Sequence, residues 1–502
     1  MTAVFGDKVR TGAIWSYAGQ VFMTLGSFVM GVILARVLGP EDFGVFIAVT
    51  AFTSMFMMAV QFGMPQAIVQ ARELSADETN AAFWSVMALG LLFVGVIAVV
   101  AEPLSTLYRS ERFPAVMYMM SGVFLLTPYT SVGLALLRRE MRFDQVARLN
   151  MLALSVSAPA SILAALLGAE VYALALGAIL NMLIIAAGIA YSVPWQPRWP
   201  RIAPVRSLLG YSGFTTLNNL LALTTNRVDN MLVGAMLSTF SLGLYNRAYS
   251  LARMPSEQFS ESLGPLVLGA LSRIQDDVDW SRQLYFKAIC AISLLTLPFL
   301  VFLLLAGPAA IDFLYGSQWH DAGIPLQVMV LGAVFVMLSV TLKGFAYAQA
   351  LVRQAVVVNF LVLSLTVVAV VALAQWGLIA VAAGIVLREA VLFTLMVRVL
   401  GRSRIGLRLV EVLHAVAPAL IAAATALLAG IPALDLGRAL RPGDPFVLLL
   451  VVGVVVFVVY ALCALVLIRV WRSHAPLIAA AVLLGEMLET LAARLRARRR
   501  PA

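Results

Sequence analysis

The sequence predicts an all-α integral membrane protein with about fourteen transmembrane helices arranged in two lobes. The chain of 502 residues is 62% hydrophobic and only 12% charged, and its mean hydropathy is +0.96. Apolar runs long enough to cross a bilayer recur from residue 11 to residue 469, with short polar stretches between them. A soluble domain carries about a quarter charged residues, so a water-soluble fold is excluded.

Each predicted span is an apolar stretch of about 20 residues or more that ends at a short polar loop. Six spans form an N-terminal lobe (1–200), six form a C-terminal lobe (201–405), and two form an extra pair (406–472). The apolar stretch after the basic N-terminus exceeds a signal-peptide core, so we expect it to remain as the first span. The predicted spans are 12–35, 43–69, 81–100, 114–137, 145–168, 171–193, 208–235, 240–271, 283–306, 323–348, 354–374, 377–399, 411–430 and 446–468.

The placement of Lys and Arg predicts the orientation, because cytoplasmic loops of membrane proteins are enriched in them. With the N-terminus in the cytoplasm, the inside loops include Arg138, Arg139, Arg142, Arg198, Arg201, Arg206, Arg402, Arg404 and Arg408. The outside loops then hold Arg36, Arg109, Arg112, Arg438 and Arg441. An even number of spans follows, with both termini inside. The basic tail (473–502) has leucines at helical spacing, which predicts an amphipathic helix on the cytoplasmic leaflet or a plain orienting tail.

The two predicted lobes also resemble one another in sequence. A shift of 199 residues places 37–44 on 236–243, Gln20 on Asn219, and Ser27 on Asn226. Six spans separate the two copies, so both have the same orientation in the membrane. Parallel repeats of this kind are related by an axis along the membrane normal.

Polar residues inside the spans predict a substrate cavity, because an ionisable group in a bilayer needs water or a partner. The span 240–271 is the most polar, and its polar side chains share one helical face. Basic groups outnumber acidic ones in the spans, which suits an anionic substrate. The candidate cavity residues are Gln20, Asn219, Asn226, Arg227, Asn246, Arg247, Arg253, Glu257, Glu261, Lys343 and Arg388.

Three alternatives remain open for these residues. Arg388 and Glu389 could pair with neighbouring helices. Arg253 and Glu257 are four residues apart and could neutralise one another as a structural pair. Asn219 and Asn226 could form hydrogen bonds between helices instead of facing a cavity.

The sequence contains no pattern that indicates an enzyme. The three histidines lack metal-ligand spacing, and no glycine-rich phosphate loop follows a strand. The acidic pair at 277–279 lies in a short loop and is interpreted as a solvated turn. The two cysteines lie in apolar segments, so we expect no disulfide. We therefore expect no catalytic residue, metal site or cofactor, and no nucleic-acid partner, because the net charge of +10 lies in loops and the tail.

Several segments together resemble the Wzx-type polysaccharide branch of the multidrug/oligosaccharidyl-lipid/polysaccharide flippase superfamily. They occur in order across the chain and are 33–44, 137–143, 229–234, 242–249 and 314–319. The resemblance implies a two-lobed fold of fourteen helices, with the first, second, seventh and eighth lining a central cavity. It also implies alternating access that carries an undecaprenyl-pyrophosphate-linked glycan across the bacterial inner membrane.

The sequence departs from this family before Gly63. Similar proteins often carry an acidic residue directly before a Phe-Gly pair at the end of the second span. This chain has Gln61 before Phe62 and Gly63. The coupling ion, H⁺ or Na⁺, is therefore left open. The expected partners are a lipid-linked glycan, membrane lipids, and a polymerase and glycosyltransferases of polysaccharide synthesis. The competing functions are a cation-coupled multidrug exporter of the same superfamily and a membrane polymerase or glycosyltransferase.

Overall fold

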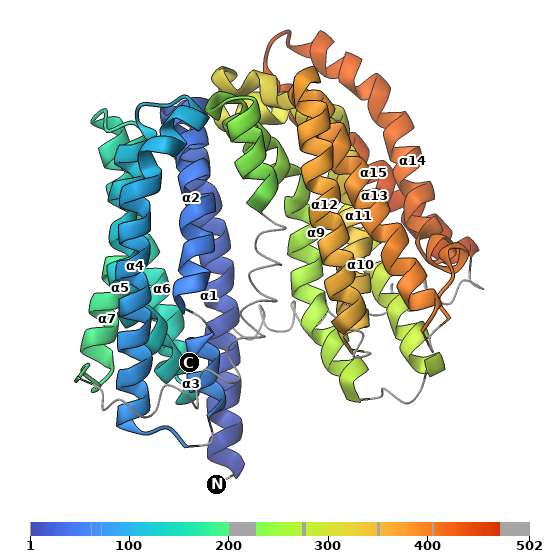
Figure 1. The fold of residues 1–502 in the computed structure, drawn as a ribbon. Helices are drawn as coiled ribbons and strands as arrows, with labels where there is room; N and C mark the ends of the chain where they lie inside the picture. The colour runs from blue at the N-terminus through green and yellow to red at the C-terminus, as the bar shows by residue number, and fades with distance from the viewer. Residues whose placement is uncertain are drawn as a thin grey trace, which may run out of the picture. The chain divides into compact units, whose positions relative to one another are not determined.

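The computed structural model describes residues 2–61, 63–71, 73–199, 227–273, 278–348, 352–403 and 406–471 (Figure 1). Throughout these ranges the ordered elements are helices. The chain divides into two compact units, residues 1–246 and residues 247–502. Twelve helical segments of the described residues are long and apolar enough to cross a membrane, which confirms an all-helical, multi-pass membrane protein.

The two remaining predicted spans are not among these twelve. Most of 208–235 lies outside the described residues, and its visible part is a helical segment at 227–236. The span 240–271 is present as the long helix α9 (Thr239–Arg273), but the charged residues along it lower its hydropathy. A total of fourteen spans thus stays a prediction, as do the four-part domain division and the tail helix, since 200–226 and 472–502 lie outside the described ranges.

Unit 1 is a helical bundle in which α1 packs on α6, α6 on α7, α5 on α7, and α4 on α5 (Figure 1). The start of α4 shows how the local sequence determines where a helix begins. Ser75 and Glu78 form a capping box at the start of α4, with the Ser75 hydroxyl accepting the Glu78 N–H at 3.1 Å. The helices are α1 (Thr2–Val37), α2 (Pro40–Gln61), α3 (Met64–Gln70), α4 (Ala76–Tyr108), α5 (Phe113–Arg139), α6 (Phe143–Leu166) and α7 (Val171–Ser192).

The predicted continuous span 43–69 is wrong, because the chain breaks into α2 and α3. Gly63 adopts the left-handed conformation (φ 69°), which ends one helix, and Pro65 stands in the first turn of the next. The guanidinium of Arg139 donates hydrogen bonds to the carbonyl oxygens of Ile68, at 2.9 Å, and Ala71. These bonds satisfy carbonyl groups at the C-terminal end of α3.

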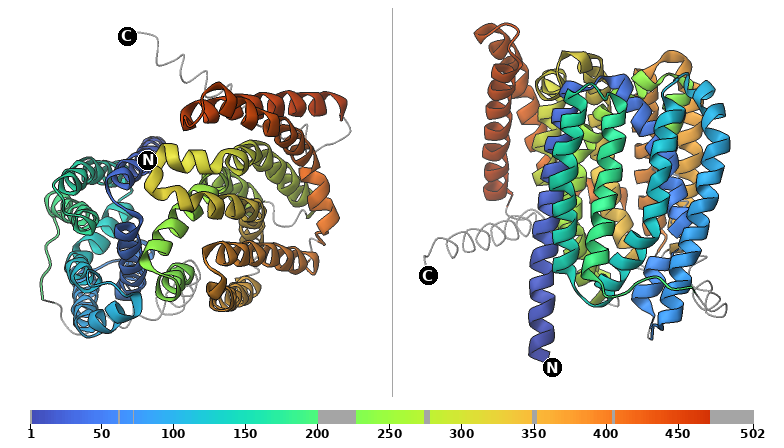
Figure 2. Two further views of the ribbon diagram at one scale, coloured as in Figure 1. Left: turned by 90° about the horizontal axis from the view of Figure 1, so that it is seen from above. Right: turned by 90° about the vertical axis from the view of Figure 1, so that its left-hand side faces the viewer.

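Unit 2 packs α11 against α10 and α13, and α14 against α10 and α15. The pair α14–α15 is visible as a separate layer at one side of this unit in both views of Figure 2. A cluster of buried side chains from α10, α11, α12, α13 and α14, including Tyr285, Met337 and Phe393, forms part of its core. Beyond α9, the elements are α10 (Val278–Tyr315), η1 (Ser317–Ala322), α11 (Gly323–Ala348), α12 (Val352–Leu373), η2 (Ala374–Trp376), α13 (Leu378–Gly401), α14 (Leu409–Leu440) and α15 (Pro445–Val470).

Four helices extend well beyond their predicted spans: α1, α4, α10 and α14. α10 continues past the predicted end at residue 306 through a kink at Ala306. Pro308 has no N–H for the carbonyl of Leu304, and the side-chain amide of Gln327 donates to that oxygen at 2.7 Å. The helix therefore continues past Pro308 to Tyr315, although the predicted span ends at residue 306.

The start of α2 and the start of α9 make a reciprocal contact within unit 1. A Cβ atom placed on Gly44 would lie 1.7 Å from the carbonyl oxygen of Thr239. A Cβ atom on Gly243 would lie 2.0 Å from the carbonyl oxygen of Pro40. The two glycines are 199 residues apart, as are Pro40 and Thr239, so equivalent residues of the predicted repeat meet one another. This symmetry supports the repeat and requires glycine at both positions.

We predict that Gly44→Ala and Gly243→Ala each lower the stability of the folded protein by about 1–3 kcal/mol, because the backbones must separate to admit a methyl group. Thermal unfolding of the detergent-solubilised protein measures the change. Gly95→Ala is the matched control, since that glycine lies within α4 with open space around its Cβ position. Equal melting temperatures for all three variants would contradict the close contact.

Candidate functional site

Within unit 2, α9 has one buried face and one more exposed face that carries its charged side chains. Leu251, Ala252 and Ser256 are buried, and the Ser256 hydroxyl donates to the carbonyl oxygen of Ala333 in α11 at 3.0 Å. Ser250 and Glu257 are exposed. Within unit 2 the helix is thus fixed by one face and leaves the other for polar contacts.

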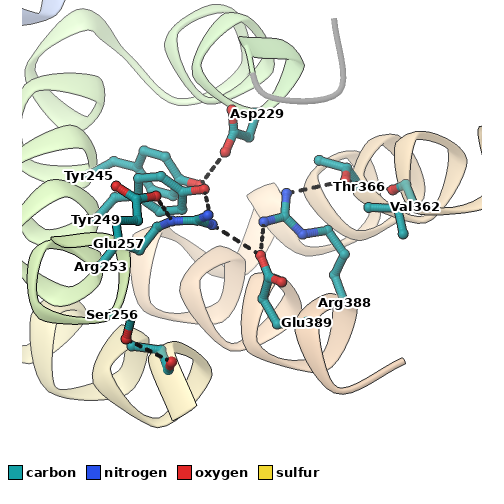
Figure 3. A network of polar contacts seen from close by, with 11 residues as sticks. Asp229, Tyr245, Tyr249, Arg253, Ser256, Glu257, Val362, Thr366, Arg388 and Glu389 are labelled. Carbon is teal, nitrogen blue, oxygen red and sulfur yellow. Dashed lines mark hydrogen bonds and ion pairs between the residues drawn. The ribbon is translucent and has the colours of Figure 1, made fainter. Parts of the chain in front are cut away.

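A cluster of polar side chains joins α9, α12 and α13 (Figure 3). We call it the charged cluster, and its members are Tyr249, Arg253, Glu257, Thr366, Arg388 and Glu389. At its centre, Oε1 of Glu389 accepts hydrogen bonds from Nη1 of Arg253, at 3.2 Å, and from Nη2 of Arg388. Nη1 of Arg388 donates to the Thr366 hydroxyl at 3.3 Å. One carboxylate therefore links two arginines from different helices.

Arg253 also has two partners on its own helix. Its Nε donates to Oε1 of Glu257 at 2.7 Å, and its Nη1 donates to the Tyr249 hydroxyl at 2.6 Å. The guanidinium carbon lies 4.9 Å from the centre of the Tyr249 ring, within the range of a cation–π contact. These contacts fix the guanidinium on the polar face of α9.

Burial differs sharply among the four charged groups. The side chains of Arg388 and Glu389 are 5% and 7% exposed, that of Arg253 is 19% exposed, and that of Glu257 is 47% exposed. The buried part thus holds two guanidinium groups and one carboxylate. Only the half-exposed Glu257 balances the remaining positive charge, which leaves a position suited to an anion. A cavity of about 10 Å³ beside Arg253 and Glu389 is too small for a substrate, and Glu257 is the most exposed of the four charged groups.

Arg247 is placed differently from the charged cluster. Its guanidinium carbon lies 5.4 Å from the ring centre of Tyr315 and 5.9 Å from that of Trp319, and both aromatic side chains are buried. Two of the segments on which the family resemblance depends therefore meet here. This contact holds the start of α9 in unit 2 against the end of α10 and η1.

A second structural contact involves Asp229, which is 1% exposed. The Tyr245 hydroxyl donates to its Oδ2 at 3.0 Å, and the Asn230 N–H donates to its Oδ1 at 2.8 Å. The Tyr108 hydroxyl donates to the carbonyl oxygen of Met231 at 2.9 Å. In unit 1 these bonds attach the helical segment 227–236 to α9 and α4.

The structure brings together only part of the predicted cavity set. Arg253, Glu257 and Arg388 belong to the charged cluster, and Gln20 is exposed on α1. Arg227 and Asn246 are half-buried. Asn219 and Asn226 lie outside the described residues, as do the side chains of Glu261 in α9 and Lys343 in α11. The cavity therefore stays a prediction.

Three cluster members are absent from the predicted set: Tyr249, Thr366 and Glu389. Tyr249 stands four residues before Arg253, so its place on the same helical face could have identified it. Glu389 is a carboxylate within an apolar span, which by itself indicates a buried partner. Thr366 gives no sequence signal, because a hydroxyl inside a span usually bonds its own helix; Thr366 also donates to the Val362 carbonyl oxygen at 2.7 Å.

A larger cavity of about 630 Å³ lies elsewhere in unit 2, between the ends of α10, α14 and α15. Its lining includes Asp312, Gln327, Arg438, Arg441 and Asp444. No member of the predicted cavity set lines it. Each arginine is strongly exposed and pairs with a nearby aspartate, so this cavity has no surplus charge that would select an anion.

The twelve candidate spans of the described residues define the class of protein as a multi-pass, all-helical membrane protein. Residues 33–324, more than half of the chain, match the family described as polysaccharide biosynthesis proteins. The chain belongs to this family of polysaccharide biosynthesis proteins. The resemblance predicted from the sequence is confirmed, and the family consists of transporters and not of enzymes.

Curated relatives are similar at low identity. The "Succinoglycan biosynthesis transport protein ExoT" of Rhizobium meliloti is 24% identical over 66% of this chain and 67% of its own length. The "Lipopolysaccharide biosynthesis protein WzxC" of Escherichia coli is 20% identical over 64% and 66%, respectively. An "Uncharacterized membrane protein in cps region" of Klebsiella pneumoniae is 23% identical over 75% and 79%.

Solved structures share the fold. The lipid II flippase MurJ, in an inward closed conformation, aligns with a TM-score of 0.73 over 91% of this chain and 99% of its own, at 16% identity. A multidrug resistance MATE transporter in an inward-facing conformation aligns with a TM-score of 0.60 over 76% and 94%, at 15% identity. The all-helical, multi-pass fold of this chain is therefore also that of MurJ and the MATE transporters, and the two-lobed arrangement stays a prediction.

We predict that Glu389→Gln lowers the stability of the protein by about 3 kcal/mol, because it removes the buried carboxylate that Arg388 and Arg253 share and leaves Glu257 as the only other carboxylate of the charged cluster. Thermal unfolding in detergent gives the shift. The control is Asp435→Asn, which removes a carboxylate from the exposed pair with Arg438 and changes stability by less than about 1 kcal/mol. A melting temperature unchanged by Glu389→Gln would show that the charged cluster does not stabilise the folded protein.

Proposed function

We propose that the protein moves an undecaprenyl-pyrophosphate-linked oligosaccharide across the bacterial inner membrane by alternating access. The transported glycan serves the synthesis of an exopolysaccharide, a capsule or a lipopolysaccharide. The observation that carries this proposal is the family match over 33–324, together with relatives whose names refer to succinoglycan transport and lipopolysaccharide biosynthesis. The fold shared with a lipid II flippase supports it, because it suits a lipid-linked substrate.

The charge of the cluster supports the same substrate. A pyrophosphate group carries negative charge that is costly to move through a low-dielectric core. Arg253 offers a fixed cation on the polar face of α9, at a point where the buried charges sum to a positive excess. A guanidinium holds two phosphate oxygens at once, which the single ammonium of lysine does not.

The remaining features of the proposal follow from the sequence pattern. The chain has fourteen spans with both termini in the cytoplasm, because Lys and Arg concentrate in the loops on that side. The other predicted cavity residues, Gln20 and Asn219 among them, line the substrate path. A polysaccharide polymerase and glycosyltransferases act before and after transport. The coupling ion is H⁺ or Na⁺.

The alternative function is a cation-coupled multidrug exporter, which the fold shared with MATE transporters favours. A cationic drug requires an excess of carboxylates. The buried part of the cluster instead holds two guanidinium groups for one carboxylate, so an anionic substrate is the better match.

We predict that Arg253→Ala and Arg253→Lys both reduce surface polysaccharide by about tenfold or more while the amount of protein in the membrane stays normal. The loss of a bidentate contact to a charged group costs about 1.5–3 kcal/mol, which corresponds to this range. Quantification of cell-surface polysaccharide, with immunoblotting of the membrane fraction, gives both measurements.

A purely structural pair of Arg253 and Glu257 predicts a different pattern. Each single change would then lower the amount of protein, and the exchange Arg253→Glu with Glu257→Arg would restore it. Normal polysaccharide in the Arg253→Ala strain would remove Arg253 from the substrate path.

A further inference from the structure

We propose that Glu257 is an exchangeable carboxylate that occupies the phosphate position on Arg253 in the empty transporter and leaves when the substrate binds. This inference rests on the proposed function, since it assumes that Arg253 receives the anionic group of the substrate. It gives Glu257 two roles. Glu257 restricts binding to ligands that carry negative charge, and it pairs with Arg253 when no substrate is bound.

The contacts of the Arg253 guanidinium identify the position. In arginine, the N–H bonds of Nε and Nη2 point the same way and form the fork that holds two oxygens of a carboxylate or phosphate. Oε1 of Glu257 takes the Nε side of this fork at 2.7 Å. Within the described part of the chain, Nη2 has no hydrogen-bond partner. The fork is therefore half occupied, by a single carboxylate oxygen.

The opposite edge of the guanidinium is not available for exchange. Nη1 donates to Glu389 and to the Tyr249 hydroxyl. Glu389 is 7% exposed and is shared with Arg388, so its departure would leave buried charges unpaired, at a cost of several kcal/mol. Arg253 thus stays in place while the fork changes its occupant.

Glu257 can leave at little cost. Its side chain is 47% exposed, and an exposed pair four residues apart on a helix contributes only about 0.3–0.5 kcal/mol. A phosphate group with more negative charge and more acceptor oxygens replaces it readily, whereas a neutral lipid alcohol does not. Competition from Glu257 therefore selects for the charged carrier lipid.

The same carboxylate serves the return of the empty transporter. Without a substrate, Arg253 would carry a surplus positive charge through the membrane, which is costly without a partner. Glu257 returns to the fork as the substrate leaves and restores neutrality in the cluster. One negative charge therefore contacts the fork of Arg253 in both states. It belongs to the ligand in the loaded transporter and to Glu257 in the empty one.

The test measures binding of farnesyl pyrophosphate to the purified full-length protein in detergent. Glu257→Gln removes the competing charge and is expected to tighten binding about two- to fivefold, as the energy of an exposed pair allows. Glu257→Asp, which keeps the charge but shortens the reach to Nε, is expected to tighten binding less. The control is Asp144→Asn, because Asp144 pairs with Arg148 at the same i, i+4 spacing on α6. Its affinity should equal that of the wild type, and farnesol should not compete in any variant.

The outcome of Arg253→Ala separates this inference from the proposed function. If Arg253→Ala abolishes binding and both Glu257 variants bind as the wild type does, the exchange is overturned and Arg253 remains the phosphate contact. If Arg253→Ala binds normally, Arg253 is not the phosphate contact, and the exchange falls together with the proposed role of Arg253. Tighter binding by Glu257→Gln, with loss in Arg253→Ala, supports the exchange.

Discussion

A charge inside the hydrocarbon of a membrane has to be paired, and Glu389 provides that pairing for two arginines at once. Its carboxylate lies between Arg253 of α9 and Arg388 of α13. Without it, the buried Arg388 would lose this carboxylate, and Arg253 would keep only its pair with the half-exposed Glu257. Because two arginines share this one carboxylate, the pairing itself produces the positive excess that suits an anionic substrate.

The segments that identify the family contribute mostly to structure. Tyr245 donates to Asp229, Arg247 lies against Tyr315 and Trp319, and Gly44 and Gly243 allow two helix starts to touch. Each contact joins segments far apart in the sequence. Residues of these segments therefore need not touch the substrate, and Arg253, which lies outside all of the segments, is the better candidate for that contact.

The sequence predicted the fold class well, because in a membrane apolar length alone identifies a helix. It predicted helix ends less well. Gly63 and Pro65 divide one predicted span by a change of backbone direction that hydropathy does not register. Conversely, α10 continues past Pro308 because a side chain from α11, Gln327, replaces the missing hydrogen bond. Contacts of this kind depend on the tertiary structure and cannot be read from one segment.

The candidate site, like the fold, was predicted only in part from the sequence. Helical periodicity placed Arg253 and Glu257 on one face of α9, and the structure confirms their contact at 2.7 Å. The sequence indicated that Glu389 needs a partner but not that the partner is Arg253, and it gave no signal for Thr366, because pairing between spans leaves no trace in the spacing of residues. Nor did it distinguish Arg247, which packs on aromatic rings, from Arg253, since both lie on the same helix.

The most direct test of the central claim is transport by the purified protein in liposomes. A fluorescent oligosaccharide linked through pyrophosphate to a polyprenyl lipid is placed in both leaflets, and a membrane-impermeant quencher reports how much reaches the outer one. A transporter of lipid-linked glycans makes nearly all of the label accessible within minutes, while a fluorescent lipid with a neutral head group stays divided between the leaflets. Quenching that stops at the outer-leaflet fraction, as in liposomes without protein, would contradict the account.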